Sequence, residues 1–267
     1  MKPPYVYVGS IRSAYEKKPW RDLERLEGIV EEDFIRPVYL GENMLPYRLL
    51  QPGSCVVPWD GTQLMDGKSA RLDLYPHLAR WWRIAEELWL ENRSSERLTL
   101  LERLDFRRGF RDQFPAKAQR VVYSKAGMHL AAARVTDSTA VIDHTLYWAA
   151  ASSEDEAIYL CAALNSPKVT QHVRPLMSYG KDERHIDMAV WRLPIPLYDP
   201  ANEHHRQLAE LGRQAEVEIA ALGLDEDRHF PALRRQIRKH LADSPTGQRI
   251  DRLVDNLLTA DALTATT

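Results

Sequence analysis

Two prolines in the segment WRLPIPLYDP divide this chain more sharply than any other feature of its sequence. Pro194 and Pro196 lack the backbone N–H that a helix interior or a central strand requires. We therefore expect an extended linker there, leading into a long helix over residues 201–222 and into further charged helical sequence. The sequence predicts a domain over residues 1–198 and a helical C-terminal segment over residues 199–267.

The part before these prolines alternates between strand-like and helix-like stretches. Short runs rich in β-branched and aromatic residues, bounded by turn residues, predict strands. These runs cover residues 5–9, 35–40, 54–59, 120–124, 128–135 and 139–149. Together with the helices between them, they predict the α+β class: a mixed twisted sheet with flanking helices, followed by the helical C-terminal segment.

Two stretches before the prolines carry clear helix signals. Residues 76–92 place apolar side chains, three tryptophans among them, at helical spacing, which favours a core-facing stripe over a surface for base stacking. Ser153, followed three residues later by Glu156, predicts a capping box at the start of a second helix. This helix is expected to end at Asn165, where a Ser-Pro step opens another one.

The charge of the chain is nearly balanced as a whole but uneven along its length. The net charge of −2 argues against a wholly basic nucleic-acid-binding protein. Residues 107–134, however, hold seven Lys and Arg residues against one acidic residue, Asp112. Acidic residues concentrate elsewhere, around residues 24–33 and 216–227. Such segregation predicts one cationic face on an otherwise neutral or acidic molecule.

Composition is that of an ordinary globular protein, with 44% hydrophobic and 28% charged residues. No apolar run approaches the roughly 18–20 residues needed to span a bilayer, and residues 1–10 do not resemble the apolar core of a signal peptide. The two cysteines, Cys55 and Cys161, lie in apolar stretches, which is typical of buried thiols in a reducing compartment. We expect a cytoplasmic protein that does not act at a membrane.

Residues 154–216 carry an ordered set of motifs. A helix-like stretch ends in Leu164-Asn165-Ser166, a loop with Gly180 follows, then Leu193-Pro194-Ile195-Pro196, and a long helix is expected from Glu203. This order resembles the C-terminal target-recognition region of adenine-N6 DNA methyltransferases and of restriction–modification proteins of the type I specificity-like and type IIG-like kinds. With upstream segments such as residues 34–50, the resemblance spans roughly residues 34–216. It implies a module that recognises double-stranded DNA.

Under this interpretation the DNA contacts divide into two groups. Arginine and lysine neutralise phosphates, and planar donors and acceptors on loops read base edges. The candidate phosphate contacts are Arg107, Arg108, Arg111, Lys117, Arg120 and Lys125. The candidate base readers are Arg174, Tyr179, Lys181, Arg184 and His185. A solvated charged face and an ordinary connection between helices remain the alternative interpretations of these two groups.

Catalytic motifs are missing from this sequence. An adenine methyltransferase needs a glycine-rich loop for S-adenosylmethionine and an Asn/Asp/Ser-Pro-Pro-Tyr/Phe motif whose polar side chain accepts a hydrogen bond from the target amine. The one similar stretch, Lys2-Pro3-Pro4-Tyr5, has a lysine at that position, and a charged lysine accepts no hydrogen bond. Histidines and carboxylates do not recur at metal-ligand spacing. We predict no catalytic residue, no metal and no cofactor here, with S-adenosylmethionine used only by a separate catalytic subunit.

Three functions are compatible with these observations. The first is a non-catalytic DNA-binding specificity module of a restriction–modification or DNA methyltransferase system, working with a methyltransferase subunit. The second is the C-terminal fragment of a split S-adenosylmethionine-dependent adenine-N6 DNA methyltransferase. The third is a protein-interaction module without DNA binding, which would use the Trp-rich stretch 76–92 and the terminal helices. Salt-sensitive binding to duplex DNA separates the first two from the third.

Overall fold

The computed structural model describes residues 4–12, 16–179 and 184–264. The chain folds as two compact units, the first formed by Met1–Pro37 and Ser54–Pro115, the second by Val38–Gly53 and Ala116–Thr267. Each unit therefore combines two separate stretches of the chain. The predicted boundary at residues 198–199 lies inside the second unit, because the helices that follow it share a core with the strands that precede it.

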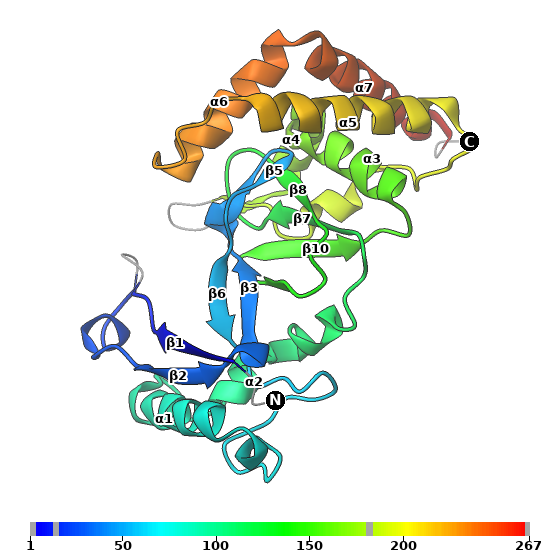
Figure 1. The fold of residues 1–267 in the computed structure, drawn as a ribbon. Coiled ribbons are helices and arrows are strands. Elements are labelled where there is room, and N and C mark those ends of the chain that lie inside the picture. Colours follow the sequence, from blue (N-terminus) through cyan, green and yellow to red (C-terminus); the bar gives the residue numbers. More distant parts are fainter. Residues whose placement is uncertain (1–3, 13–15, 180–183, 265–267) are drawn as a thin grey trace. The chain divides into compact units, whose positions relative to one another are not determined.

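The first unit is a β-hairpin covered by a helix. Its elements are β1 (Tyr5–Gly9), β2 (Glu27–Glu31), the first part of β3 (Ile35–Tyr39), most of β6 (Gly53–Val56), α1 (Pro76–Asn92) and α2 (Leu100–Leu104). β1 and β2 pair antiparallel, with Tyr5 opposite Glu31, and α1 packs against β2 (Figure 1). Their shared core consists of Val30, Phe34, Met65, Leu72, Leu78, Ala79 and Trp82.

Helix α1 is anchored to β2 at its N-terminus. The buried carboxylate of Glu31 accepts hydrogen bonds from the backbone N–H groups of His77 (3.1 Å) and Leu78 (2.8 Å), where its negative charge is also stabilised by the positive end of the helix dipole. Trp82 is buried in the core, and its Nε1 donates to Glu86 at 2.8 Å. The prediction of a core-facing tryptophan stripe is confirmed for Trp82, while Trp81 and Trp89 are half-buried.

The second unit is a small sheet beneath two layers of helices. Its strands are β4 (Met44–Leu45), β5 (Arg48–Leu49), β7 (Arg120–Ser124), β8 (Ala132–Val135), β9 (Val141–Ile142), β10 (Leu146–Ala150), β11 (Ser178–Tyr179) and β12 (Arg184–His185). Its helices are α3 (Glu154–Asn165), α4 (Pro167–Val173), α5 (Glu203–Ala221), α6 (Phe230–Asp243) and α7 (Pro245–Thr264). Figure 1 shows α5, α6 and α7 as an outer layer, with α3 and α4 between them and the sheet.

Strand β7 is the centre of this unit. It lies between β10 and β8, antiparallel to both, and all five of its residues are buried. Because successive side chains of a strand point to opposite faces, Val121 and Tyr123 join the large core under the helices, whereas Val122 joins a smaller core with Met44 and Ile142. The sheet is therefore covered on both faces.

The α+β class is confirmed, but the predicted sheet is divided. The described strands form sheets of two or three strands, and the pair β3–β9 is parallel whereas the other pairs are antiparallel. The predicted strand over residues 139–149 breaks into β9 and β10, because the Asp143 carboxylate accepts the Thr145 N–H (2.9 Å) and closes a turn between them. Strand β2 lies in an acid-rich stretch and was not predicted.

The linker and the helix after it agree with the proline signal. Residues 193–199 have no regular structure, and α5 begins at Glu203, where the Asn202 side chain accepts from the His204 N–H at 2.9 Å. The apolar face of α5 is buried within its own unit, at Leu208, Leu211, Ala215 and Ile219. The helical sequence that follows is interrupted at residues 222–229, which separate α5 from α6.

The helix starts around residues 153–167 are confirmed in part. The Ser153 hydroxyl accepts the Glu156 N–H at 3.1 Å, but the Glu156 carboxylate accepts from the Ser152 N–H (2.6 Å), so the capping box is only half formed. Helix α3 ends at Asn165 and Pro167 is the first residue of α4, as predicted. None of the helices in the described residues is long and apolar enough to cross a bilayer.

Candidate nucleic-acid interface

The basic stretch 107–134 is divided between the two units. Arg107, Arg108 and Arg111 belong to the first unit, whereas Lys117 and the residues after it belong to the second, because the division falls after Pro115. The residues that the sequence assigned to a single cationic face therefore belong to two units, and each unit is described by itself.

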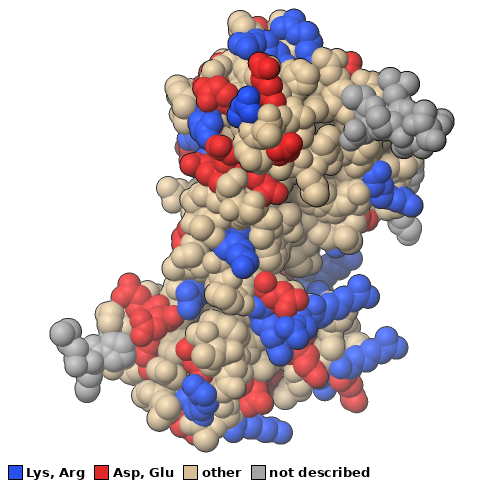
Figure 2. Space-filling view, turned by 90° about the vertical axis from the view of Figure 1, so that its right-hand side faces the viewer, with Lys and Arg blue, Asp and Glu red and all other residues tan. Residues whose placement is uncertain are grey.

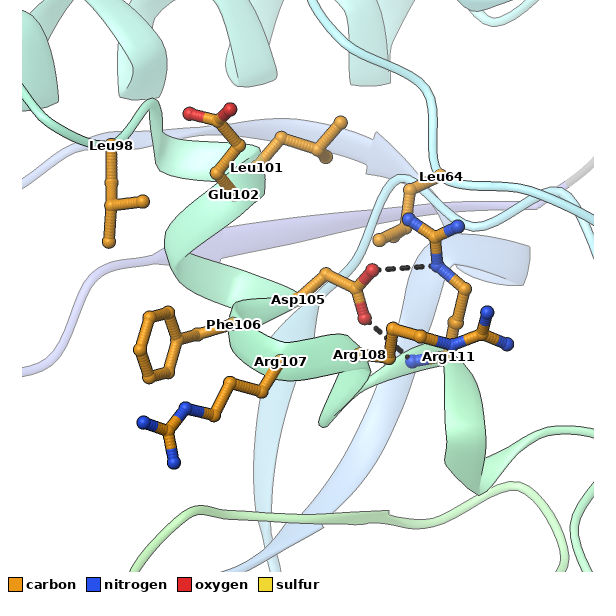
Figure 3. A pocket seen from close by; sticks show the side chains of 9 residues that line it. All are labelled: Leu64, Leu98, Leu101, Glu102, Asp105, Phe106, Arg107, Arg108 and Arg111. Carbon is orange, nitrogen blue, oxygen red and sulfur yellow. Dashed lines mark hydrogen bonds and ion pairs between the residues drawn. The ribbon is translucent and has the colours of Figure 1, made fainter.

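In the first unit, the three arginines line one hollow beside α2 (Figure 3). The buried carboxylate of Asp105 accepts two hydrogen bonds from Arg111, from its backbone N–H (2.9 Å) and its Nε (2.7 Å). Arg108 forms an exposed ion pair with Asp112 at 2.9 Å. Arg107 lies with its guanidinium 5.4 Å from the ring centre of Phe106, and no described carboxylate is within ion-pair distance of it.

The backbone of this turn is strained. Arg107 and Arg108 have φ angles of 54° and 62°, in the left-handed region that residues with a Cβ adopt at a cost of about 1 kcal/mol or more each. Strain of this kind is common where a side chain must be held in a set direction for binding. The turn at residues 105–111 presents Arg107 to solvent, while Arg108 and Arg111 already have carboxylate partners.

The prediction of Arg120 as a phosphate contact is wrong. Its side chain is fully buried, with Nη1 donating to the Ala140 carbonyl (3.1 Å) and Nη2 to the Asp137 carbonyl (2.6 Å). Burial also lowers the pKa of its guanidinium. Arg120 therefore holds the turn between β8 and β9 and has no access to DNA. Arg134, another member of the basic stretch, is likewise engaged, by Glu216 and Glu154.

In the second unit, the turn after β7 and the segment around residue 185 are joined by backbone hydrogen bonds. β11 and β12 form an antiparallel hairpin, with Ser178 opposite His185, and His185 also forms a bridge with Ala126. The carbonyl of Lys125 accepts from the N–H groups of Ile186 (2.9 Å) and Asp187 (3.1 Å). The segment predicted as a loop is thus a two-stranded ribbon attached to the end of β7.

Arg174 belongs to the same neighbourhood. It follows α4, and its Nη2 lies 3.4 Å from the carbonyl of Met128, in the turn between β7 and β8. The pKa of His129 in that turn is lowered by burial and by the positive charges of Arg238 and Arg174. The Lys125 ammonium is 5.5 Å from the ring centre of Tyr147. Lys125, Arg174 and His185 therefore lie around one turn, residues 125–129.

The remaining predicted residues are placed less fully. Tyr179 and Arg184 face each other in the ribbon backbone, but their side chains lie outside the described residues, as does all of Lys181. Lys117 is exposed on the segment that leads into β7. On the face shown in Figure 2, lysine and arginine are interspersed with aspartate and glutamate.

The basic residues of α6 were not among the predicted site residues. Arg235, Arg238 and Lys239 lie in what was predicted only as further charged helical sequence, although the run RRQIRK contains four basic residues within six positions. The influence of Arg238 on His129 relates this helix to the turn 125–129. Among the described residues, no three His, Cys, Asp or Glu side chains are grouped so that they could hold a metal ion.

Comparison with known proteins adds no relative: no protein-family model matches the chain, and no curated protein matches it.

Proposed function

We propose that this chain is a DNA-binding specificity module of a restriction–modification or DNA methyltransferase system, acting in the cytoplasm beside a separate methyltransferase subunit. The observation that carries the proposal is that Lys125, Arg174 and the β11–β12 ribbon lie around one turn of the second unit, residues 125–129. Lys125 was predicted from the sequence as a phosphate contact, and Arg174 and the residues of the ribbon were predicted as base readers. These predictions came from two distant parts of the chain.

The shape of the ribbon supports a role in the major groove. That groove admits a two-stranded β-ribbon, and each base pair presents a distinct pattern of donors and acceptors there. Tyr179, Arg184 and His185 belong to the ribbon and would read base edges, as would Lys181, which lies outside the described residues. Lys125, predicted as a phosphate contact, lies at the base of the ribbon, and Arg174, which the sequence placed among the base readers, lies beside it; we propose that both contact the flanking phosphates.

The order of elements also supports the proposal. Helix α3 ends in Leu164-Asn165-Ser166, the short helix α4 follows, then the ribbon, the irregular residues 193–199 and the long helix α5. This is the order in the target-recognition regions that the sequence resembles. The interaction-module alternative loses support, because Trp82 and the apolar face of α5 are buried inside their own units.

Fluorescence anisotropy with labelled duplex DNA tests this function. The full chain is expected to bind duplex DNA with an affinity that falls as salt rises. Replacing Lys125 and Arg174 together by glutamine should weaken binding about tenfold or more and reduce the salt slope by about 2, since each phosphate contact contributes roughly 0.9. The variant R249Q/R252Q removes the same charge from exposed positions of α7 and should bind as the unaltered chain does.

Two results would contradict the proposal. One is the absence of any binding to duplex DNA at low salt. The other is a Lys125/Arg174 double variant that keeps both its affinity and its salt slope.

A further inference from the structure

A second concave site lies in the second unit, on the side of α6 that faces α4 and α7. It is a hollow of about 400 Å³, lined by the end of α6, the beginnings of α4 and α7, and the residues Tyr47, His129 and Leu130. This volume is within the range of about 300–1,000 Å³ that is typical of small-molecule sites. The DNA-binding proposal makes no use of it.

One wall of the hollow is cationic. Arg235, Arg238 and Lys239 line it from a single helix, and no described carboxylate is paired with any of them. The acidic lining residue is Asp251, whose carboxylate accepts the Ser166 hydroxyl at 2.8 Å. Burial and the neighbouring charge of Arg235 lower the pKa of Arg238. An anion bound at this wall would offset the repulsion between these cations.

Several other residues of the lining are apolar. Leu130, Leu241, Ile250 and the aromatic residue Tyr47 belong to the large core and also line the hollow. The hydroxyl of Thr170 accepts the Leu130 N–H at 3.2 Å, which holds this side chain in place at the edge of the hollow. The site therefore suits a ligand with an anionic group at one end and a flat, largely apolar group at the other.

Tyr47 is held in this position against its backbone preference. It occupies the two-residue turn between β4 and β5, directly after Pro46, with a φ of 61°. This position of a turn normally takes glycine or asparagine, because a Cβ is strained there. Its N–H donates to the Ala132 carbonyl at 2.9 Å, and its side chain is 7% exposed. Backbone strain of this kind is common at ligand-binding sites.

The two walls are also tied to each other. Arg234, on α6 next to Arg235, donates from Nε to the Met44 carbonyl at 2.9 Å and from Nη2 to the Gly41 carbonyl at 2.5 Å. Met44 begins the β4–β5 hairpin that carries Tyr47. The aromatic wall and the cationic wall are thus fixed relative to each other before any ligand binds, which reduces the entropic cost of binding.

We propose that this hollow binds a nucleoside monophosphate, with the phosphate against Arg235, Arg238 and Lys239 and the base between Tyr47 and the aliphatic lining. Guanidinium groups bind phosphate oxygens through paired, charge-assisted hydrogen bonds, and aromatic rings stack on bases. The nucleotide comes either free from solution or as an unpaired nucleotide of a strand. The site stands on its own contacts and does not depend on the DNA-binding proposal.

Isothermal titration calorimetry of the full chain with dAMP tests the site. We expect saturable one-to-one binding, and a loss of affinity of about tenfold or more in R235Q/R238Q, because two charge-assisted contacts are removed. Ala242→Trp keeps every charge but fills the hollow from its exposed rim, and should also abolish binding. R249Q/R252Q, with the same loss of charge on α7, should bind dAMP normally, as should the Lys125/Arg174 variant.

The outcomes are separable from those of the DNA experiment. The proposal is overturned if dAMP does not bind, if R235Q/R238Q and Ala242→Trp both bind it normally, or if inorganic phosphate binds as tightly as dAMP. Displacement of dAMP by a duplex with one unpaired adenine, but not by a fully paired duplex, supports the site with a strand as the source. Binding of dAMP without such displacement supports it with the free nucleotide as the source.

Discussion

At the scale of single residues, the second unit depends on polar side chains that satisfy backbone groups from distant elements. Asn165, at the end of α3, accepts from the Ala132 N–H and donates to the Ala132 carbonyl, both at 2.9 Å. Arg120 and Arg234 donate in the same way to carbonyls of other elements. The backbone groups that these side chains bind are shielded from water and would otherwise have no hydrogen-bond partner. Removing one of the side chains should therefore destabilise the unit.

Asp143 makes the unit sensitive to acid. Burial alone would raise the pKa of its carboxyl, but hydrogen bonds from His144 and Thr145 outweigh burial and lower the pKa from 3.8 to about 2. The folded pKa is below the unfolded one, so the stability contributed by Asp143 is present above pH 3.8 and is lost as the pH falls towards 2.

We expect Asp143→Asn to remove about 1–2 kcal/mol of stability at neutral pH and to flatten the acid dependence in this window. Urea unfolding at a series of pH values measures both effects. Asp243→Asn, an exposed carboxylate on α6, should leave the profile unchanged. An Asp143→Asn profile as steep as that of the unaltered chain would show that another group controls the acid sensitivity.

At the scale of elements, the packing of α5 on α3 depends on one glycine. A Cβ on Gly212 would lie 2.6 Å from the Ile158 Cγ2 and 3.2 Å from the Ala162 Cβ. Ala162 keeps the side of α3 that faces Gly212 small, so the two helices approach closely. This contact orients α3, whose C-terminal end carries Asn165 and the start of α4.

Gly212→Val should therefore destabilise the protein by about 3 kcal/mol, because the helices must separate to admit the side chain. Ala220→Val, at an exposed position of the same helix, controls for the helix propensity of valine and should cost less than about 1 kcal/mol. Thermal and urea unfolding of the two variants give the comparison. Equal losses in both would mean that the close approach contributes nothing.

At the scale of the whole molecule, each unit is assembled from two stretches of chain. The segment 38–53 supplies Met44, Leu45 and Tyr47 to the cores of the second unit, and the carbonyls to which Arg234 donates. Without the segment 38–53, the stretch 116–267 would lack both carbonyls that accept hydrogen bonds from the Arg234 guanidinium. A buried charge without partners costs several kcal/mol.

We expect the fragment 116–267 alone to lack a cooperative thermal transition, and the fragment joined to residues 38–53 by a flexible linker to regain one. Near-ultraviolet circular dichroism follows the packing of the aromatic residues in both. A cooperative transition of the shorter fragment at the temperature of the full chain would refute the assignment of residues 38–53 to this unit.

The sequence by itself determined the features that depend on neighbours a few residues apart. The Ser153 cap, the Ser166-Pro167 start of α4, the break at Pro194 and Pro196 and the apolar stripe of α5 were all predictable, because backbone geometry and local hydrogen bonds decide them. The α+β class followed from the same local signals.

Only the tertiary structure decided which basic residues are accessible and which lie together. Arg120 and Lys117 lie in the same basic stretch of sequence, yet Arg120 is buried and donates to the carbonyls of Asp137 and Ala140. Arg107 and Lys125 also lie in this stretch, but they belong to different units. The joining of the β11–β12 ribbon to the turn 125–129 and the hollow beside α6 likewise arise from pairings between residues far apart in the chain. Such pairings leave no periodic trace in a sequence, because they are selected by the packing of whole elements rather than by local preference.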